Sequence, residues 1–353
     1  MDVMKEYAPV DIVIITALKD ELNAVLAVFD EKTPSIEQKG PLSAFRGRIQ
    51  NEVLDRPIEI VAIQAPGMGN VAAAQTVARA IDVWNPSHLI LAGIAGGVKS
   101  KDIDSLGDVV IADQIVGYEP GKVRNSGLEH RWEVFRPTYP LLTAAREISQ
   151  QDWWKIISKP RPSGGTSRPP KAHFGVVASG EKVIASADTI KDLKSVWSKL
   201  AAVEMEGYGS AFASYTSASR TGFLMAKSLS DWSNSKKDDR WREYACSASA
   251  SFLRRLIQRF SFDPPPGPEK QPHKTDRKPF SGRNKIELCR RLGNSWEDLA
   301  DYFEIPPWER ARFKQGRECQ GIWEWLELRR KLEALLDGLR FIDRGDLADI
   351  LTD

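Results

Sequence analysis

Short apolar runs alternate with helical patterns between Asp11 and Phe260, and no other feature of the sequence limits the possible folds as strongly. DIVIITA is largely apolar and β-branched, and LKDELNAVLAVF then places apolar residues at helical spacing. Similar strand-like runs occur at 58–65, 88–97, 107–118, 172–180 and 221–231, with a further helical pattern at 70–84. Strands without polar alternation are typical of a sheet covered by helices on both faces. The pattern predicts a three-layer α/β domain.

Two segments rich in proline and charge interrupt these patterns. Residues 158–173 are predicted to form a flexible surface loop within the first domain, because strand-like sequence resumes directly afterwards. Residues 262–282 have too little apolar surface to order themselves and favour an extended linker. We therefore expect a first domain at 1–261 and a second at 283–353.

The region after the linker contains no strand-like run, and its apolar residues recur at helical spacing. Ser295 with Asp298 is typical of a helix start, and Pro306-Pro307 suits the start of another helix. This region is predicted to be a small all-helical bundle.

Charge and cysteine usage exclude several classes of protein. A net charge of +2 gives no strong attraction to nucleic acid. Cys246, Cys289 and Cys319 show neither metal-ligand spacing nor an even count for disulfides, and the four histidines are scattered. We expect no metal and no cofactor. No signal peptide or membrane span is visible, so we expect a soluble, cytoplasmic protein without a membrane partner.

Two glutamates stand in apolar surroundings. LAAVEMEGYGSAFA, residues 200–213, places Glu204 and Glu206 on either side of Met205. Burying a charge is costly unless the charge is paired or used. The pair therefore marks a candidate site.

Two further carboxylates follow predicted strands. Glu21 falls in the first turn of a predicted helix, where the helix dipole helps to keep its carboxylate ionised. It could instead have no functional role and, together with Asp20, only complement that dipole. Asp231 ends SLSD at a strand end, where ligands collect in open α/β sheets, or it could cap the next helix.

Two glycine-rich turns complete the set. APGMGNVAAA carries Gly67 and Gly69 before a helix, where backbone N–H groups can approach a ligand closely. LAGIAGGV leaves room for a flat ligand at the end of a buried strand. A tight turn and close strand–helix packing would explain these glycines as well.

Together these motifs resemble the purine nucleoside phosphorylase / 5′-methylthioadenosine–S-adenosylhomocysteine nucleosidase superfamily. The resemblance covers about residues 11–260, and it rests on the helix start at Glu21 and on GMGNVAAA, GIAGGV…GDVVIAD, VVASGEKVI, AVEMEG and SLSD in that order. It implies the fold of that superfamily and a homodimer or higher oligomer.

The resemblance also implies catalytic roles. Asp231 would act as the acid at purine N7, Ser230 would orient Asp231, and Glu21 would take the proton of the attacking water. This is the two-carboxyl logic of glycosidases. Glu206 would bind the ribose 2′- and 3′-hydroxyls through charge-assisted hydrogen bonds.

The rest of the substrate pocket follows from the same resemblance. Met205 would lie against the sugar, while Glu204 would support the hydrogen-bond network or be structural. The remaining pocket residues would be Gly67, Ile94, Ala95, Gly96, Val183 and Ile184.

Two features bear on the nucleophile and the substrate. HLILAGIAGG lacks the arginine with which phosphorolytic members hold phosphate, and the Glu21 carboxylate would repel phosphate, so water is the expected nucleophile. Ile94 stands where the nucleosidases usually carry a small hydroxyl residue, which leaves open how the water is positioned. A basic segment could meet a 5′-phosphate chain or be a solvated loop; its residues are Lys122, Arg124, Arg131 and Arg136.

The helical region resembles the death fold, whose bacterial versions are called death-like or effector-associated domains. The resemblance rests on Leu292-Gly293, Trp296, Leu299-Ala300, Ile305, Trp323, Leu326, Leu335, Leu339 and Asp346-Leu347-Ala348. It implies binding to a similar domain on a protein partner.

The two resemblances together imply a purine nucleoside or nucleotide N-glycosidase, with adenine favoured. It would act as an effector coupled to a signalling partner, in immune or conflict defence. Two alternatives stay open: a phosphate-dependent phosphorylase, and an inactive nucleoside-binding adaptor.

Overall fold

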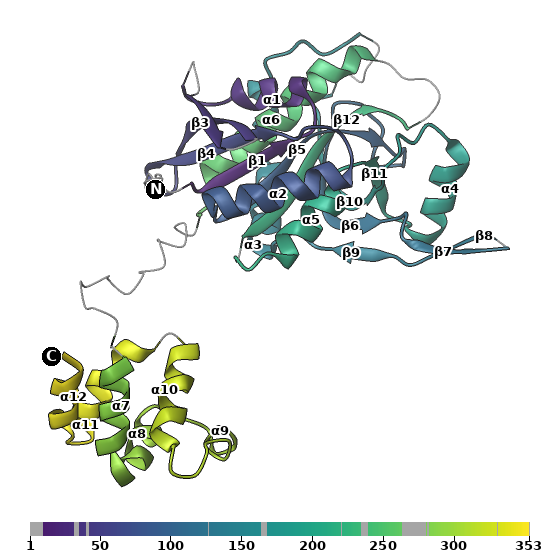
Figure 1. The fold of residues 1–353 in the computed structure, drawn as a ribbon. Coiled ribbons are helices and arrows are strands. Elements are labelled where there is room, and N and C mark those ends of the chain that lie inside the picture. Colours follow the sequence, from purple (N-terminus) through teal and green to yellow (C-terminus); the bar gives the residue numbers. More distant parts are fainter. Residues whose placement is uncertain are drawn as a thin grey trace. The chain divides into compact units, whose positions relative to one another are not determined.

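The computed structural model describes residues 10–31, 35–39, 42–125, 127–163, 168–219, 221–233, 239–262, 280, 282–329 and 331–352. The chain divides into two compact units between Pro268 and Glu269 (Figure 1). The linker predicted at 262–282 lies mostly outside the described residues and stays a prediction. Within the described part of the chain, no helix is both long and apolar enough to cross a membrane.

A mixed sheet forms the centre of the first unit. Its strands are β1 (Ile12–Thr16), β2 (Ser35–Lys39), β3 (Leu42–Asn51), β4 (Arg56–Gln64), β5 (His88–Gly97), β6 (Val109–Gly117), β9 (Glu133–Phe135), β10 (Ala172–Ser179), β11 (Leu200–Glu204) and β12 (Gly222–Asp231). Their order is β11-β10-β6-β12-β5-β1-β4-β3-β2, with β9 beside β6. β5 pairs in parallel with both β1 and β12.

The sheet closes on itself at one end. β11 pairs in parallel with β10, and it also pairs antiparallel with β5 through Ala202 with Gly97 and Val203 with Gly96. Strands β5, β12, β6, β10 and β11 thereby form a ring. The closure brings the ends of β5, β11 and β12 together.

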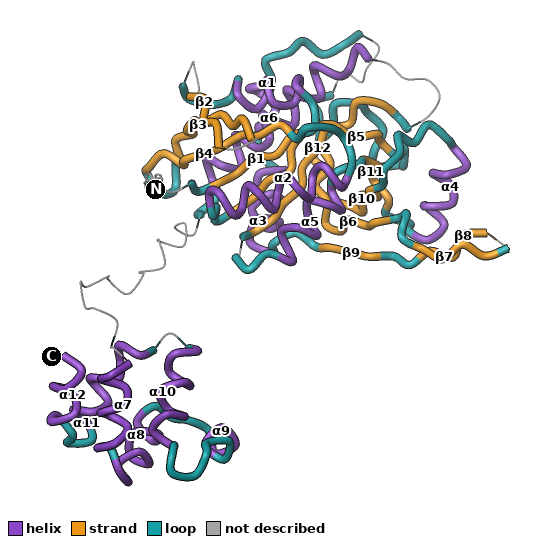
Figure 2. Tube along the Cα trace, viewed as in Figure 1, coloured by secondary structure: helices purple, strands orange, loops and turns teal. Residues whose placement is uncertain are grey.

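Helices cover both faces of the sheet (Figure 2). On one face lie α1 (Lys19–Leu26), α3 (Tyr139–Ser149) and α6 (Arg242–Arg259), which share a buried apolar cluster with Ile12 and Ile14 of β1. On the other lie α2 (Asn70–Trp84) and α5 (Gly207–Thr216), which share a second cluster with Val13 and Ile15. α4 (Ala187–Val196) packs through Leu193 beside β10 and β11. Successive side chains of a strand point to opposite faces, so a strand buried on both faces has a continuous apolar run. The predicted three-layer α/β domain is confirmed.

The second unit is helical, as predicted. Its helices are α7 (Gly282–Arg291), α8 (Trp296–Tyr302), α9 (Pro307–Arg310), α10 (Glu318–Leu328), α11 (Leu335–Phe341) and α12 (Gly345–Thr352). They enclose a core that includes Leu299, Trp323, Leu326 and Leu339. Pro307 begins α9, and Ser295 precedes α8 without a capping hydrogen bond from its side chain.

The segment predicted as a flexible loop at 158–173 is anchored where it is described. Arg168 donates to both carboxylate oxygens of Asp108, over 3.0 and 2.7 Å. Arg161 donates to Ser105 Oγ over 2.7 Å and lies over the Trp241 ring. The segment also ends earlier than predicted, because β10 begins at Ala172. Arg161 and Arg168 have fixed partners that composition alone did not reveal. Residues 164–167 lie outside the described part of the chain.

Acid is expected to destabilise the first unit through Asp108. Its carboxylate is buried, and burial acts to raise its pKa. Hydrogen bonds from His173, Arg168 and the Lys171 N–H nevertheless hold that pKa below its ordinary value of 3.8. A lowered folded pKa contributes stability above the unfolded value, and this contribution is lost as the pH falls through the folded value.

Unfolding free energies of the wild type and of Asp108→Asn, measured from pH 6 down to about pH 2, test this expectation. The variant should be less stable near neutral pH and should lack part of the acid dependence. Asp102→Asn, at an exposed position, is the control. Parallel curves for the wild type and Asp108→Asn would contradict the assignment.

Candidate active site

The ends of β5, β11 and β12 border a cavity of about 280 Å³. Eleven of the twelve residues predicted for the site line it: Glu21, Ile94, Ala95, Gly96, Val183, Ile184, Glu204, Met205, Glu206, Ser230 and Asp231. The closure of the sheet and the turn from β1 into α1 bring these separate segments together.

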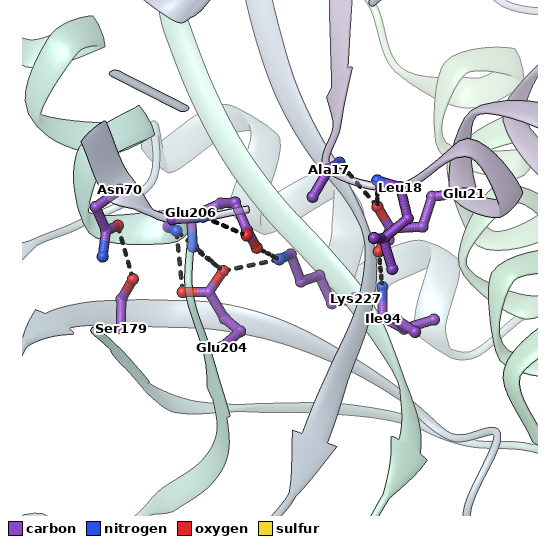
Figure 3. A network of polar contacts seen from close by, with 12 residues as sticks. Ala17, Leu18, Glu21, Asn70, Ile94, Ser179, Glu204, Glu206 and Lys227 are labelled. Atoms are coloured by element: carbon purple, nitrogen blue, oxygen red, sulfur yellow. Dashed lines mark hydrogen bonds and ion pairs between the residues drawn. The ribbon is translucent and has the colours of Figure 1, made fainter. Parts of the chain in front are cut away.

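A buried lysine lies between the two glutamates. Lys227, in the middle of β12, places its Nζ 2.8 Å from Glu204 Oε2 and 2.7 Å from Glu206 Oε2 (Figure 3). Burial alone would lower the pKa of Lys227, but attraction to Glu204, Glu206 and Glu21 raises that pKa well above its ordinary value. Lys227 is therefore a cation held among carboxylates, and it explains how two charges tolerate this environment.

Glu206 is ionised and keeps acceptor capacity. Burial acts to raise its pKa, but Lys227 and the N–H of Gly69 lower that pKa below the ordinary value. The Gly69 N–H donates to Glu206 Oε1 over 3.1 Å. A carboxylate has about four lone-pair positions, so Glu206 can still accept hydrogen bonds from a ligand.

Glu204 is more fully engaged. Besides Lys227, its oxygens accept hydrogen bonds from the backbone N–H groups of Glu206 and Gly207, each over 2.9 Å. These bonds fix the turn between β11 and α5. Glu204 therefore has less acceptor capacity left for a ligand than Glu206 has.

The turn that supplies Gly69 is itself held in place. Asn70, the first residue of α2, accepts a hydrogen bond from Ser179 Oγ (Figure 3). It accepts another from the Gly209 N–H. These bonds tie the start of α2 to β10 and α5. The Gly69 N–H is thereby aimed at Glu206.

Glu21 is buried at the start of α1. Its Oε2 accepts from the N–H groups of Ala17 and Leu18, and its Oε1 from Ile94, each over 2.8 Å. Burial raises the pKa of Glu21 above the ordinary value, even though Lys227 and these hydrogen bonds oppose the rise. A carboxylate whose pKa is raised toward neutrality suits a general base. Gly93 makes room for it, since a Cβ there would lie 2.2 Å from Glu21 Oε1.

Asp231 is held at the end of β12. Ser230 Oγ lies 3.2 Å from Asp231 Oδ2, and the Ser233 N–H donates to Asp231 Oδ1 over 2.8 Å. A Cβ on Gly96 would lie 2.2 Å from Ser233 Oγ and 3.2 Å from Asp231 Oδ1. Gly96 thus leaves the space in which this carboxylate is positioned.

Two sets of residues that the sequence singled out for the site do not line the cavity. Gly67 is exposed and does not line it; the neighbouring Met68 does, and Gly69 acts through its N–H. The basic segment lies elsewhere: Lys122 and Arg124 are exposed on β7 (Gly121–Arg124), which with β8 (Gly127–His130) forms a hairpin that projects from the first unit (Figure 1). Arg131 and Arg136 do not line the cavity either.

The sequence reasoning missed Lys227, although a charge inside the apolar run GFLMAKSLSD was a visible signal. It also missed four polar residues that line the cavity: Lys182, Ser233, Asp239 and Arg242. The described residues contain no group of His, Cys, Asp and Glu that could hold a metal ion.

Comparison with known proteins places this geometry in context. The family model of the phosphorylase superfamily matches residues 11–260, and that of bacterial Death-like domain 3 matches residues 282–353. ATP nucleosidase Cap17 of Escherichia coli (strain KTE188) is 25% identical over 70% of this chain and 51% of its own length. The chain thus spans about half the length of that relative. A 5′-methylthioadenosine/S-adenosylhomocysteine nucleosidase of Staphylococcus haemolyticus is 25% identical over 61% of this chain and 85% of its own.

Solved structures share the fold of the first unit. S-adenosylhomocysteine nucleosidase from Streptococcus pyogenes, in complex with 5-methylthiotubericidin, gives a TM-score of 0.57 at 23% identity, over 72% of this chain and 98% of that one. Futalosine hydrolase of Helicobacter pylori gives 0.56 at 21% identity, over 70% of this chain and 97% of that one.

Proposed function

The chain belongs to the phosphorylase superfamily and carries a bacterial death-like domain, and we propose that it is a hydrolytic purine N-glycosidase. The observation that carries the proposal is the convergence of Glu21, Glu206 and Asp231 on one cavity. Nucleosidases among its relatives support this class of reaction. An inactive binding module would not need three carboxylates at the cost of burying them.

The proposed reaction divides the work among these groups. Asp231, oriented by Ser230, protonates purine N7, so that the electrons of the C1′–N9 bond can move to the base. Glu206 holds the 2′- and 3′-hydroxyls while the sugar gains oxocarbenium character. Glu21 removes a proton from water as the water attacks C1′. The products are the free base and the sugar.

Water is favoured over phosphate as the nucleophile by the charges around Glu21. Lys227, the cation that attracts Glu21, already faces two further carboxylates. A phosphate that took the place of the water beside Glu21 would be repelled by this carboxylate, and Lys227 would offer it no uncommitted positive charge. A phosphorylase therefore remains the second candidate.

The test is release of free base by the full chain, measured by chromatography. ATP, dATP, AMP, adenosine, inosine, guanosine, methylthioadenosine and S-adenosylhomocysteine are each incubated with and without phosphate. Base released without phosphate supports the hydrolase. Release that requires phosphate makes the protein a phosphorylase, and no release from any substrate would contradict a constitutive enzyme.

We further propose that the first unit self-associates through the face formed by α2 and α5. Val71, Phe212 and Tyr215 are exposed there, at 77%, 44% and 79%. Exposed apolar clusters of this kind mark interaction surfaces. Light scattering of Tyr215→Glu against the wild type tests the role of the face.

The helical unit is proposed to couple the enzyme to an acidic protein partner, in a defence pathway. A cleft on it is lined by Phe313 and Trp325 and by more cations than anions: the exposed Arg312, Lys314, Arg317 and Arg329 against Glu309 and Glu324. Complementary charge would steer and orient such a partner.

Ending the chain after Phe262 is expected to leave kcat/KM for base release within about two-fold of the wild-type value. Loss of a catalytic contact would lower kcat/KM by more than this. The deletion removes none of the residues that line the cavity. The measurement is kcat/KM for the best substrate of the panel. A large loss would show that the helical unit supports catalysis directly.

A further inference from the structure

Among the described residues, the cations that line the cavity are Lys182 and Arg242, and Lys182 already has a partner. Lys227 pairs with two of the lining glutamates but does not itself line the cavity. Lys227 is buried between Glu204 and Glu206. Lys182 lies 2.6 Å from Glu119 and its side chain is 74% exposed, so water also solvates its charge. Arg242, the first residue of α6, is the other lining cation, and its side chain is 40% exposed.

Arg242 is held in place but keeps most of its hydrogen-bonding capacity. Its Nε lies 2.8 Å from Asp20 Oδ2, without the alignment of a hydrogen bond. Among the described residues its side chain has no other ion pair and no hydrogen bond. A guanidinium carries five N–H groups in a fixed fork, so most of them are available to a ligand.

The position of Arg242 suits one part of the proposed substrate. Its partner Asp20 is adjacent to Glu21, the group proposed to act at the sugar. The base would lie by Asp231, Val183 and Ile184 and the ring hydroxyls at Glu206, so the sugar substituent without a partner is the one at C5′. Arg242 is the lining cation left for it.

We propose that the substrate is a purine nucleoside 5′-phosphate and that Arg242 binds its phosphate. The proposal rests on the N-glycosidase function above and names its substrate class. Guanidinium binds phosphate oxygens through paired, charge-assisted hydrogen bonds. A neutral nucleoside, or one with a 5′-thioether, gives Arg242 no anion.

The other lining charges make Arg242 decisive. Glu21 and Asp239 line the same cavity, and both carboxylates repel a phosphate. Without Arg242, little positive charge in the cavity would offset this repulsion of the phosphate of a nucleotide. A neutral nucleoside would not be affected in the same way.

The experiment compares AMP, ATP and adenosine as substrates of the full-length wild type, Arg242→Ala and Arg242→Lys, without phosphate buffer. The wild type should prefer the nucleotides. Arg242→Ala should lower kcat/KM for AMP by about 10- to 100-fold, the effect of losing a hydrogen bond to a charged group. The value for adenosine should change by less than about three-fold. Arg242→Lys keeps the charge without the fork and should fall in between.

Arg254→Ala is the matched control, because Arg254 lies on the same helix and pairs with Asp30 over 2.7 Å but does not line the cavity. It should leave the ratio of AMP to adenosine unchanged. An equal loss on all substrates in Arg242→Ala would assign Arg242 a structural role and overturn the proposal.

The two proposals fail in different ways. Cleavage of adenosine but not of AMP or ATP overturns the substrate class and leaves the N-glycosidase intact. Cleavage of nothing overturns the N-glycosidase, and calorimetric binding of AMP and adenosine then decides the role of Arg242. The role of Arg242 in binding phosphate is overturned if AMP binds no more tightly than adenosine. It is also overturned if AMP binds Arg242→Ala as tightly as it binds the wild type.

Discussion

Replacing Asp231 with asparagine is expected to lower kcat for base release by about 10²- to 10⁴-fold, the usual contribution of a general acid. The amide fits the same space, but it cannot give a proton to N7. Its oxygen can still accept from the Ser233 N–H, as Asp231 Oδ1 does now, so the fold should survive. Base release and the thermal midpoint, measured on the same preparation, test both parts.

A 7-methylated purine nucleoside sharpens the test. Its ring already carries the positive charge that protonation would create, so Asp231→Asn should cleave it with a much smaller loss. Asp82→Asn, on the exposed side of α2, is the control. If Asp231→Asn kept wild-type turnover on ordinary nucleosides, the acid would have to be another group.

Replacing Lys227 with methionine is expected to destabilise the first unit by about 3–5 kcal/mol, the range for leaving a buried charge without its partner. Lys227 is the cation that faces both Glu204 and Glu206. Its loss should also raise the pKa of Glu206, because attraction to Lys227 helps to lower that pKa now. Activity should then decline at a higher pH on the acid side.

Denaturant unfolding at neutral pH gives the change in stability. Adding Glu204→Gln to Lys227→Met removes one of the stranded charges, so the double variant should recover stability without recovering full activity. Lys155→Met, at an exposed position, is the control. Unchanged stability in Lys227→Met would mean that the carboxylates do not depend on this lysine.

Local sequence patterns predicted the elements well where a single period dominates. The apolar run HLILAGIAGG coincides with β5, and NVAAAQTVARAIDVW coincides with α2. The pairing of β11 with β5 was not predictable, since it depends on the curvature of the whole sheet. Without that pairing, nothing in the sequence shows that Lys227 reaches Glu204 and Glu206.

The site residues also divide into those that a local motif predicts and those that only the whole fold reveals. Those predicted by motif, such as Glu21 and Asp231, line the cavity because each ends or follows a strand of the sheet. The basic segment does not line the cavity, and two of its residues lie on a hairpin that its sequence did not reveal. Arg242 escaped notice because only its position at the cavity distinguishes it from the other arginines of the sequence.

The lysine among the glutamates has a consequence for what the cavity binds most tightly. Glu21, Glu204 and Glu206 set three negative charges against the one positive charge of Lys227, which leaves a net charge of −2 when all are ionised. A resting sugar is neutral, whereas a sugar that is losing its base is positive. The cavity is therefore electrostatically matched to the second state, and inhibitors with a cationic ring in place of ribose should bind more tightly than neutral ones of the same shape.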